Sequence, residues 1–153
     1  MDMLIKLYNQ LPDSPTLASA ASQVHKPLAP EHDLVIAWVA RHFTPGWASE
    51  AGVALANRPV SLFIATQADA LLGFCCYDAT ARGFVGPIGV AEHARRGGLG
   101  AALLRACMHD MRAAGYAYAV AGAVGAPEFF RRVAGATEIE GSTPGIYSGM
   151  LKP

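Results

Sequence analysis

The chain has 153 residues, 52% of them hydrophobic and 16% charged, and its 12 lysines and arginines balance its 12 aspartates and glutamates. This composition excludes an intrinsically disordered chain, and the length suits one domain, which we expect to span residues 1–153. No apolar run approaches the roughly 20 residues that cross a bilayer, and the first residues lack a secretory signal, so we expect a cytoplasmic protein with no membrane partner.

Residues 1–60 are expected to form one strand, a loop and two helices. Residues 3–11 alternate loosely between apolar and polar side chains, which is typical of a strand. Prolines and small residues make 13–30 a loop, with room for a short helix. A helix is predicted over 31–43, because acidic residues lie in its first turn and Thr44-Pro45-Gly46 follows it. A second helix is predicted over 48–56.

The second part of the chain changes from a helical to a strand period. Strands are predicted over 61–66 and 71–77, joined by a hairpin at 67–70, and over 83–90, where Gly86-Pro87 predicts a bulge or local break. Next come a helix over 101–114, a strand over 116–123, a helix over 126–134, and strands over 137–140 and 146–151. The core face of the first of these helices is predicted to consist of Leu103, Leu104, Cys107, Met108 and Met111. This order indicates an α+β, or mixed α/β, domain.

The three cysteines and five histidines predict no metal site. No two cysteines have the two-residue spacing of zinc or redox pairs, and no histidine pair lies at helical spacing with a carboxylate. Cys75 and Cys76 are adjacent in a predicted strand, so their side chains should point to opposite faces of the sheet. We expect all three thiols to be buried.

Charge is unevenly distributed along the chain. Residues 82–132 contain seven arginines against three acidic residues, whereas residues 1–81 contain four basic and seven acidic residues. A nucleic-acid-binding protein would have a stronger overall basic character, so we expect no nucleic-acid partner. A small polyanion fits the local excess better.

That excess surrounds a glycine-rich segment, Arg95-Arg96-Gly97-Gly98-Leu99-Gly100, between a predicted strand and a predicted helix. The first amides of a helix have no internal partners, and the helix dipole favours an anion there. Glycines let a phosphate approach the backbone closely, and arginines add charged donors. The segment therefore indicates a pyrophosphate site. A ligand-free turn with solvated arginines is the alternative.

Other glycine motifs do not match this segment. A dinucleotide-binding fingerprint needs a third glycine at Leu103 and an acidic residue near Val120. A P-loop needs lysine and then serine or threonine, where the chain has Ala101 and Ala102. No glycine–x–serine–x–glycine elbow is present.

Residues 90–104 resemble the acetyl-CoA motif of the GNAT N-acetyltransferases, in which Arg95, Gly98 and Gly100 would be the motif positions. Residues 126–135 resemble the second conserved helix of that family, so the resemblance covers about 61–150. It implies a GNAT-like α+β fold, with a central, mostly antiparallel, twisted sheet of six or seven strands flanked by about four helices. It also implies that the strands at 83–90 and 116–123 separate to admit the pantetheine arm.

By this resemblance, acetyl-CoA is the co-substrate and no metal is needed. Amides at the start of the helix would hold its pyrophosphate, and backbone groups of the preceding strand would pair with the arm. The residues implied in CoA binding are Ile88, Gly89, Val90, Arg95, Arg96, Gly97, Gly98, Leu99, Gly100, Ala101, Phe130 and Arg132. Arg131 is an alternative to Arg132 for the 3′-phosphate.

The sequence departs from the family at the positions of its catalytic groups. Many members carry a tyrosine in the second helix, near Phe129 or Phe130, that protonates the departing sulfur, and phenylalanine has no proton to donate. The strand before the motif has no carboxylate to act as a base. Glu92, Glu128 and Tyr147 are the remaining catalytic candidates, and His93 is adjacent to the first of them.

The implied function is an acetyl-CoA-dependent N-acetyltransferase that acts on a primary amine of a small molecule or a protein. A non-catalytic acyl-CoA-binding module is the alternative, because the usual acid and base are missing. Acceptor contacts are expected from residues 25–60 and 141–146. Within the first range, Trp38, Phe43 and Trp47 either line the acceptor pocket or form part of the core. The oligomeric state is open, a homodimer included.

Overall fold

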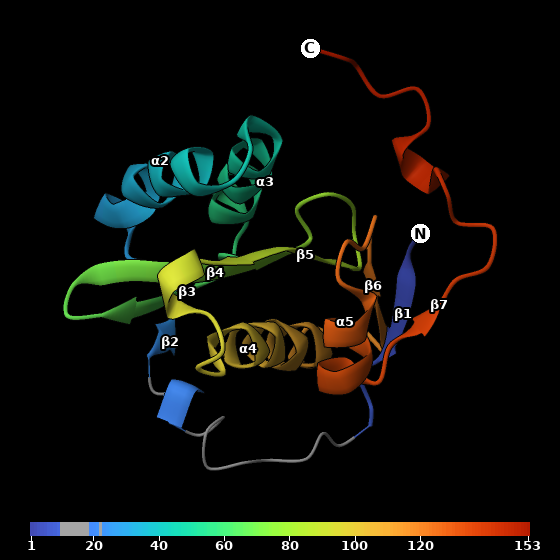
Figure 1. Ribbon diagram of the computed structural model, residues 1–153, viewed down its shortest axis with the longest axis horizontal. Coiled ribbons are helices and arrows are strands. Elements are labelled where there is room, and N and C mark those ends of the chain that lie inside the picture. Colours follow the sequence, from blue (N-terminus) through green and yellow to red (C-terminus); the bar gives the residue numbers. More distant parts are fainter. Residues whose placement is uncertain (10–18, 22) are drawn as a thin grey trace.

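The computed structural model describes residues 1–9, 19–21 and 23–153. It has a seven-stranded sheet with helices on both faces, which is the predicted mixed α/β class (Figure 1). In chain order, the elements are β1 (Met3–Lys6), β2 (Val24–His25), η1 (Ala29–Glu31), α2 (His32–His42), α3 (Pro45–Ala56), β3 (Leu62–Gln67), β4 (Ala70–Tyr77), β5 (Phe84–Val90), η2 (Glu92–Ala94), α4 (Leu99–Ala113), β6 (Tyr118–Ala121), α5 (Pro127–Ala134), β7 (Thr137–Glu138) and η3 (Gly145–Tyr147). No helix in these described ranges is both long and apolar enough to cross a membrane.

The strand order is β2-β3-β4-β5-β6-β1-β7. Every neighbouring pair is antiparallel except β5 and β6, which run parallel. The β4–β5 register shifts between Cys75 and Tyr77, opposite Gly86-Pro87, which confirms the predicted bulge. The connection from β5 to β6 contains α4, as a parallel pair requires a crossover.

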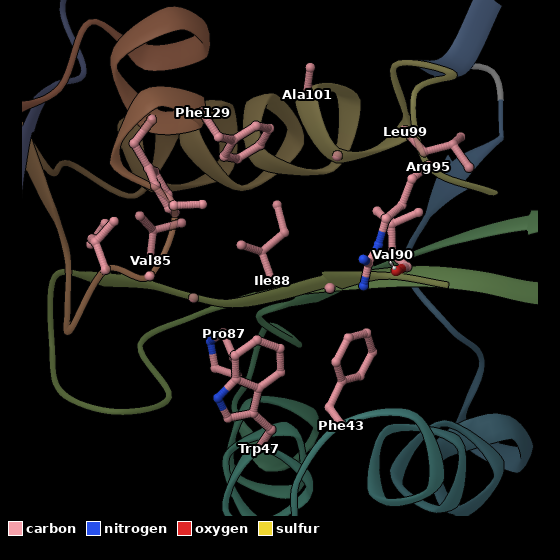
Figure 2. Close-up of a pocket in the computed structure, with 18 of the residues that line it drawn as sticks. Phe43, Trp47, Val85, Pro87, Ile88, Val90, Arg95, Leu99, Ala101 and Phe129 are labelled. Atoms are coloured by element: carbon pink, nitrogen blue, oxygen red, sulfur yellow. Dashed lines mark hydrogen bonds between the residues drawn. The ribbon is translucent and has the colours of Figure 1, made fainter. Parts of the chain in front are cut away.

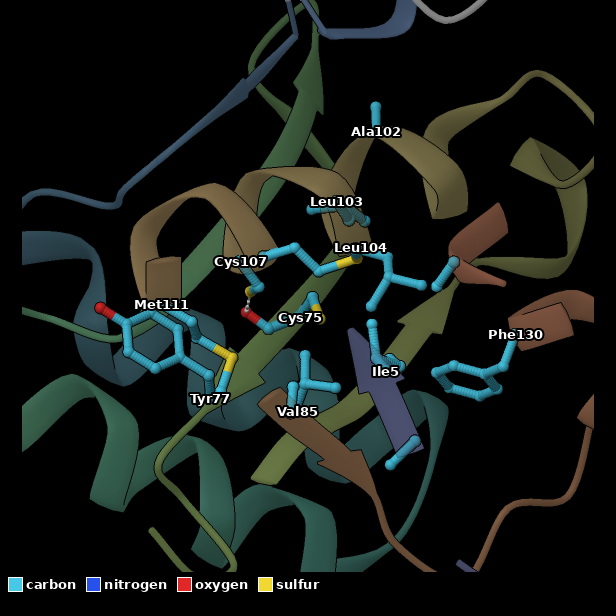
Figure 3. Close-up of a cluster of buried hydrophobic side chains, with 14 of the residues drawn as sticks. Ile5, Cys75, Tyr77, Val85, Ala102, Leu103, Leu104, Cys107, Met111 and Phe130 are labelled. Atoms are coloured by element: carbon cyan, nitrogen blue, oxygen red, sulfur yellow. Dashed lines mark hydrogen bonds between the residues drawn. The ribbon is translucent and has the colours of Figure 1, made fainter. Parts of the chain in front are cut away.

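One core layer lies between the sheet and α4 with α5 (Figures 1 and 3). The predicted helical face is confirmed, since all five of its members are at most 6% exposed. They pack against Ile5 of β1, Val85 of β5 and Phe130 of α5. The Cys107 thiol also donates to the Cys75 carbonyl across 3.4 Å. This layer fixes the start of α4 relative to β5.

The opposite face of the sheet is covered by α2 and α3 (Figure 1). Val35 and Trp38 of α2 pack here with Leu62 and Ile64 of β3. Cys76 belongs to this layer while Cys75 belongs to the α4 layer, so the two thiols do point to opposite faces. All three cysteines are buried and free, as predicted.

The segment Thr44-Pro45-Gly46 both follows one helix and begins the next. We expected α3 to start at Ala48, but it starts at Pro45. The reason is that Thr44 is an N-cap, whose hydroxyl accepts from the Trp47 amide at 3.1 Å, and proline suits the first helical position. This cap fixes the position of Trp47 in the first turn of α3.

The N-cap gives a testable stability effect. Thr44→Ala should lower the free energy of unfolding by about 1 kcal/mol, because the Trp47 amide loses its acceptor. Urea unfolding monitored by circular dichroism measures this change. Thr44→Ser keeps the hydroxyl and should remain close to the unsubstituted protein. Equal losses for the two variants would contradict the capping role.

The strand predicted over 146–151 is wrong. Residues 145–147 form the 3-10 helix η3 and no strand follows, because Gly145 and Gly149 have positive φ angles of 61° and 77°. Met150 and Leu151 are 63% and 96% exposed, so their apolar side chains have no sheet face to cover.

Two other expectations near the N-terminus need correction. The first strand is shorter than 3–11 and ends at Lys6, and part of the loop predicted over 13–30 forms β2, which pairs with β3. The rest of that prediction lies largely at residues 10–18 and 22, outside the described residues. The strands predicted over 116–123 and 137–140 are also shorter, as β6 and β7.

Candidate functional site

A cavity of about 650 Å³ opens where β5 and β6 separate (Figure 2). The two strands pair only at Phe84 with Val120 and at Val85 with Ala121. Beyond this point, residues 88–90 keep their pairing with β4, residues 86 and 87 form the bulge, and none of the five has a partner strand on the β6 side. The free backbone edge of β5 therefore forms one wall of the cavity, and residues 121–126 form the facing wall.

The N-terminus of α4 lies at one end of the cavity. Gly98 is the N-cap, with a left-handed φ of 81°, and the Ala102 amide donates to its carbonyl. Among the described residues, the amides of 96–101 have no hydrogen-bond partner. Arg96, Gly98, Leu99, Gly100 and Ala101 all line the cavity. Free amides and the positive end of a 15-residue helix make this a site for an anion.

Three arginines line the same end of the cavity. The Arg95 Nε donates to the Val90 carbonyl at 3.1 Å and so ties the end of β5 to the glycine-rich loop (Figure 2). Arg96 and Arg132 also line it, and Arg132 has no ion-pair partner in the described part of the chain. Arg131 is instead paired with Glu128 and Glu138. Of the two α5 arginines, only Arg132 is placed to contact a ligand in the cavity.

Phe43 and Trp47 line the cavity from the α2/α3 side of the sheet (Figure 2). Their rings are stacked, with centroids 5.1 Å apart and planes at 29°. The Phe43 ring lies directly on the backbone of β5, since a Cβ added to Gly89 would be 2.4 Å from Phe43 Cζ. Trp38 is only 7% exposed and belongs to the core. Of the three aromatic residues expected in either the core or the pocket, Trp38 is therefore a core residue, and Phe43 and Trp47 line the cavity.

Tyr147, from the C-terminal segment, lies next to the cavity wall just after β6. A Cβ added to Gly122 would be 2.3 Å from the Tyr147 hydroxyl oxygen, and Gly122 lines the cavity. Burial, with the nearby carboxylates of Asp2 and Glu50, raises the pKa of Tyr147 above its usual value. The hydroxyl therefore stays protonated at neutral pH.

Asp2 positions this part of the cavity wall, although sequence reasoning did not single it out. Its side chain is 7% exposed, and its Oδ1 accepts from the Ala123 amide at 2.9 Å. Its own amide donates to the Ser142 hydroxyl at 2.7 Å. Asp2 thereby joins the end of β6 to the 141–147 segment. A buried carboxylate near the start of a chain gives no local sequence signal of such a role.

The structure brings together most of the residues implied in CoA binding. Of the twelve, only Gly97 does not line the cavity. The catalytic candidates are more scattered: Glu92 and Glu128 are exposed and lie outside the lining, and Glu128 is paired with Arg131. Phe129 and Phe130 both line the cavity, so no hydroxyl enters it from α5.

The lining has little acid–base chemistry of its own. Its titratable side chains are Arg95, Arg96 and Arg132, and every other lining residue is apolar or glycine. Within the described ranges, no group of three or more histidine, cysteine or carboxylate side chains could hold a metal ion. The cavity thus combines positive charge and free amides at one end with apolar walls elsewhere, and its lining has no carboxylate or histidine side chain.

Similar proteins share this arrangement of strands and helices. A GCN5-related glucosamine N-acetyltransferase region of a fungal multi-domain GH3 beta-N-acetylglucosaminidase superposes with a TM-score of 0.68 at 15% identity, covering 87% of this chain and 19% of that one. A GCN5-related N-acetyltransferase from Sphaerobacter thermophilus superposes with a TM-score of 0.63 at 20% identity, covering 89% and 47%. The chain therefore spans less than half the length of either protein, and these likenesses establish the fold alone. No curated protein matches the sequence.

The family assignment comes from the sequence itself. The sequence pattern of the acetyltransferase (GNAT) family matches residues 29–135, which include α2 to α5 and the whole glycine-rich loop. Since this match covers well over half of the 153 residues, the chain belongs to the GNAT family of acetyltransferases.

Proposed function

We propose that this protein transfers an acetyl group from acetyl-CoA to a primary amine, which attacks the thioester directly. The observation that carries the proposal is the single cavity that joins the free amides of α4 to the unpaired edge of β5. One end suits a diphosphate, and the other suits an extended chain with amide groups. Family membership supports acetyl transfer in general.

The residues present fit acetyl-CoA, which when bound would supply an activated acyl group and a thiolate leaving group. The amides of 96–101 and the Arg96 guanidinium would hold the diphosphate, and Arg132 would reach the 3′-phosphate. The backbone groups that residues 86–90 leave unpaired would pair with the pantetheine amides, and a backbone amide there would stabilise the developing oxyanion. Positioning of this kind can lower a barrier by about 7–11 kcal/mol without a dedicated base.

The route of proton transfer is limited, because the cavity lining offers no general base. The lining has no histidine or carboxylate side chain, so an acceptor that arrives as an ammonium ion must lose its proton to water before it attacks. The Tyr147 hydroxyl is protonated and lies against Gly122, where β6 ends. We therefore assign Tyr147, rather than Glu92 or Glu128, as the group best placed to protonate the departing sulfur.

A non-catalytic acyl-CoA-binding module is the second candidate. The phenylalanines at 129 and 130 and the absence of a carboxylate from the lining favour it. Such a module would need the same pyrophosphate site. The two functions therefore differ only in turnover and not in CoA affinity.

Calorimetry with CoA and a free-thiol assay with acetyl-CoA and a panel of amines separate the two functions. We expect binding and amine-dependent thiol release. Arg96→Ala should weaken CoA binding by about 1–3 kcal/mol, because a charged hydrogen bond is lost. Arg112→Ala, at the exposed far end of α4, is the matched control and should leave affinity unchanged. Tight binding without thiol release for any amine would support the module, and absence of CoA binding would contradict both.

The pH dependence of kcat/KM should follow the acceptor and not the protein. With no base in the lining, the ascending limb should move with the pKa of each amine tested. Because the pKa of Tyr147 is raised, its proton is lost only above the usual tyrosine value of about 10, so no descending limb is expected below that pH. Initial rates with amines of different pKa measure both limbs. An ascending limb fixed near neutrality for all amines would reveal a protein base and contradict this account.

A further inference from the structure

We propose that the acceptor is a primary amine carried by an aromatic or similarly bulky apolar group, seated against Phe43 and Trp47 with its ammonium drawn in by Glu50. This inference rests on the proposed acetyl transfer and names the substrate class for that same cavity. It uses Phe43 and Trp47, which the sequence left undecided between core and pocket, together with Glu50 of α3.

The two ends of the cavity have different chemistry. All three cationic lining residues belong to the loop before α4 or to α5, at the end of the cavity that suits an anion. On the α2/α3 side, the lining consists of the aromatic side chains of Phe43 and Trp47. They lie on the opposite side of β5 from Ile88 and Phe129 (Figure 2). A ligand entering from this side meets apolar surface and no positive charge among the described lining residues.

The aromatic wall is already packed in place. Phe43 stacks on Trp47 and also contacts the fully buried Phe74. The centroids of the Phe43 and Phe74 rings are 5.8 Å apart. Trp47 is further held by the N-cap bond from its amide to Thr44. Both rings remain only partly buried, so they present a face to the cavity. A preformed apolar wall next to the reacting bond selects a ligand with a matching ring or branched chain.

Charge at this end favours a cation. Glu50 lies one turn beyond Trp47 on α3, where its Oε1 accepts from the Thr80 hydroxyl at 2.5 Å. Its second oxygen has no hydrogen-bond partner in the described ranges. Glu50 and Asp2 both act electrostatically on Tyr147, which touches the cavity wall at Gly122. Neither carboxylate lines the cavity itself, but both lie on the side of the aromatic wall and away from the arginines, where they would attract an ammonium ion that the rings also favour.

One carboxylate with a free oxygen suits one ammonium group. Polyamines and other polycations need several acidic partners along their length, and Glu50 is the one acidic residue that α3 contributes beside the aromatic wall. The acceptor is therefore expected to have a single amine close to its ring or branched group. This distinguishes it from spermidine and from a lysine side chain in a polar peptide.

The test compares acceptors at saturating acetyl-CoA. We expect kcat/KM for 2-phenylethylamine to exceed that for spermidine or a polar lysine peptide by about tenfold or more, because burial of its ring against the aromatic wall stabilises the bound acceptor by this amount. Trp47→Ala should raise the KM for 2-phenylethylamine roughly tenfold, the loss typical of a buried aromatic contact, while the Kd for CoA stays unchanged. Trp47→Leu repeats the measurement with a larger side chain if the alanine variant is unstable. Tyr8→Ala, which removes an exposed aromatic residue elsewhere, should change neither constant.

Glu50→Gln tests the charge separately from the shape. It should raise the KM for 2-phenylethylamine several-fold but leave inhibition by the uncharged 2-phenylethanol unchanged, since the glutamine oxygen still accepts from Thr80. Asp69→Asn, in the β3–β4 turn, is the charge-matched control. If CoA binds and spermidine or the peptide is the better acceptor, if no amine reacts, or if Trp47→Ala leaves KM unchanged, the acceptor assignment is wrong while CoA binding stands. If CoA does not bind, the proposed function fails first.

Discussion

Replacing Gly100 by leucine should abolish CoA binding without loss of stability. Gly100 lies in the first turn of α4 and lines the cavity. A Cβ added there would be 3.4 Å from Phe129 Cε2 and 3.8 Å from Val90 Cγ2, so it would point into the space between α4 and β5. The rest of a leucine side chain would fill that space, in front of the free amides of the helix.

The expected loss is large because several charged hydrogen bonds depend on the same approach. Loss of two or more, each about 1.5–3 kcal/mol, weakens binding by at least about a hundredfold. Leucine is a better helix former than glycine by up to about 1 kcal/mol, so the free energy of unfolding should not fall.

Calorimetry with CoA and urea unfolding measure the two quantities. Gly100→Ala is the matched control, because its Cβ makes only ordinary contacts, and it should bind CoA within a few-fold of the unsubstituted protein. Unchanged CoA affinity in Gly100→Leu would contradict the placement of the diphosphate at this helix.

The free amides and arginines at the start of α4 could be predicted from the sequence because these features are local. A strand, a glycine-rich turn and a helix start follow one another within residues 84–101, and the amides of such a turn are free whatever packs around it. The core face of α4 could be predicted for the same reason, since helical spacing is a local property. Both parts depend on neighbours along the chain.

The acceptor end depends on contacts between distant segments. Phe43 and Gly89 meet across 46 residues of sequence, and Asp2 meets Ala123 across 121. Nothing in the spacing of Trp38, Phe43 and Trp47 distinguishes the core residue from the two that line the cavity. Residues 146–151 illustrate the opposite error, since their apolar side chains suggested a strand where glycines at 145 and 149 turn the chain instead.

Gly89→Ala is the substitution that tests the acceptor wall most directly. Its Cβ would be 2.4 Å from Phe43 Cζ and 2.8 Å from both Cε atoms, so the ring must move away from β5. Because Phe43 stacks on Trp47, the displacement should disturb both rings. Alanine in a strand is otherwise favoured over glycine by roughly 0.5–1 kcal/mol, so any loss of stability comes from the overlap. We expect a net loss of about 1–3 kcal/mol, as is usual for overpacking.

A second substitution should reverse this loss if the overlap is its cause. Phe43→Leu removes the ring edge that meets the new Cβ, so the double variant should be more stable than the sum of the two single changes, with a coupling of about 1 kcal/mol or more. Urea unfolding of the four proteins in this cycle measures the coupling. Gly52→Ala on α3, whose Cβ would meet Ile36 Cδ1 at 3.8 Å, controls for a glycine change without overlap and should not destabilise. Additive effects of Gly89→Ala and Phe43→Leu would mean that Phe43 does not lie on β5, and the aromatic wall of the cavity would have to be placed elsewhere.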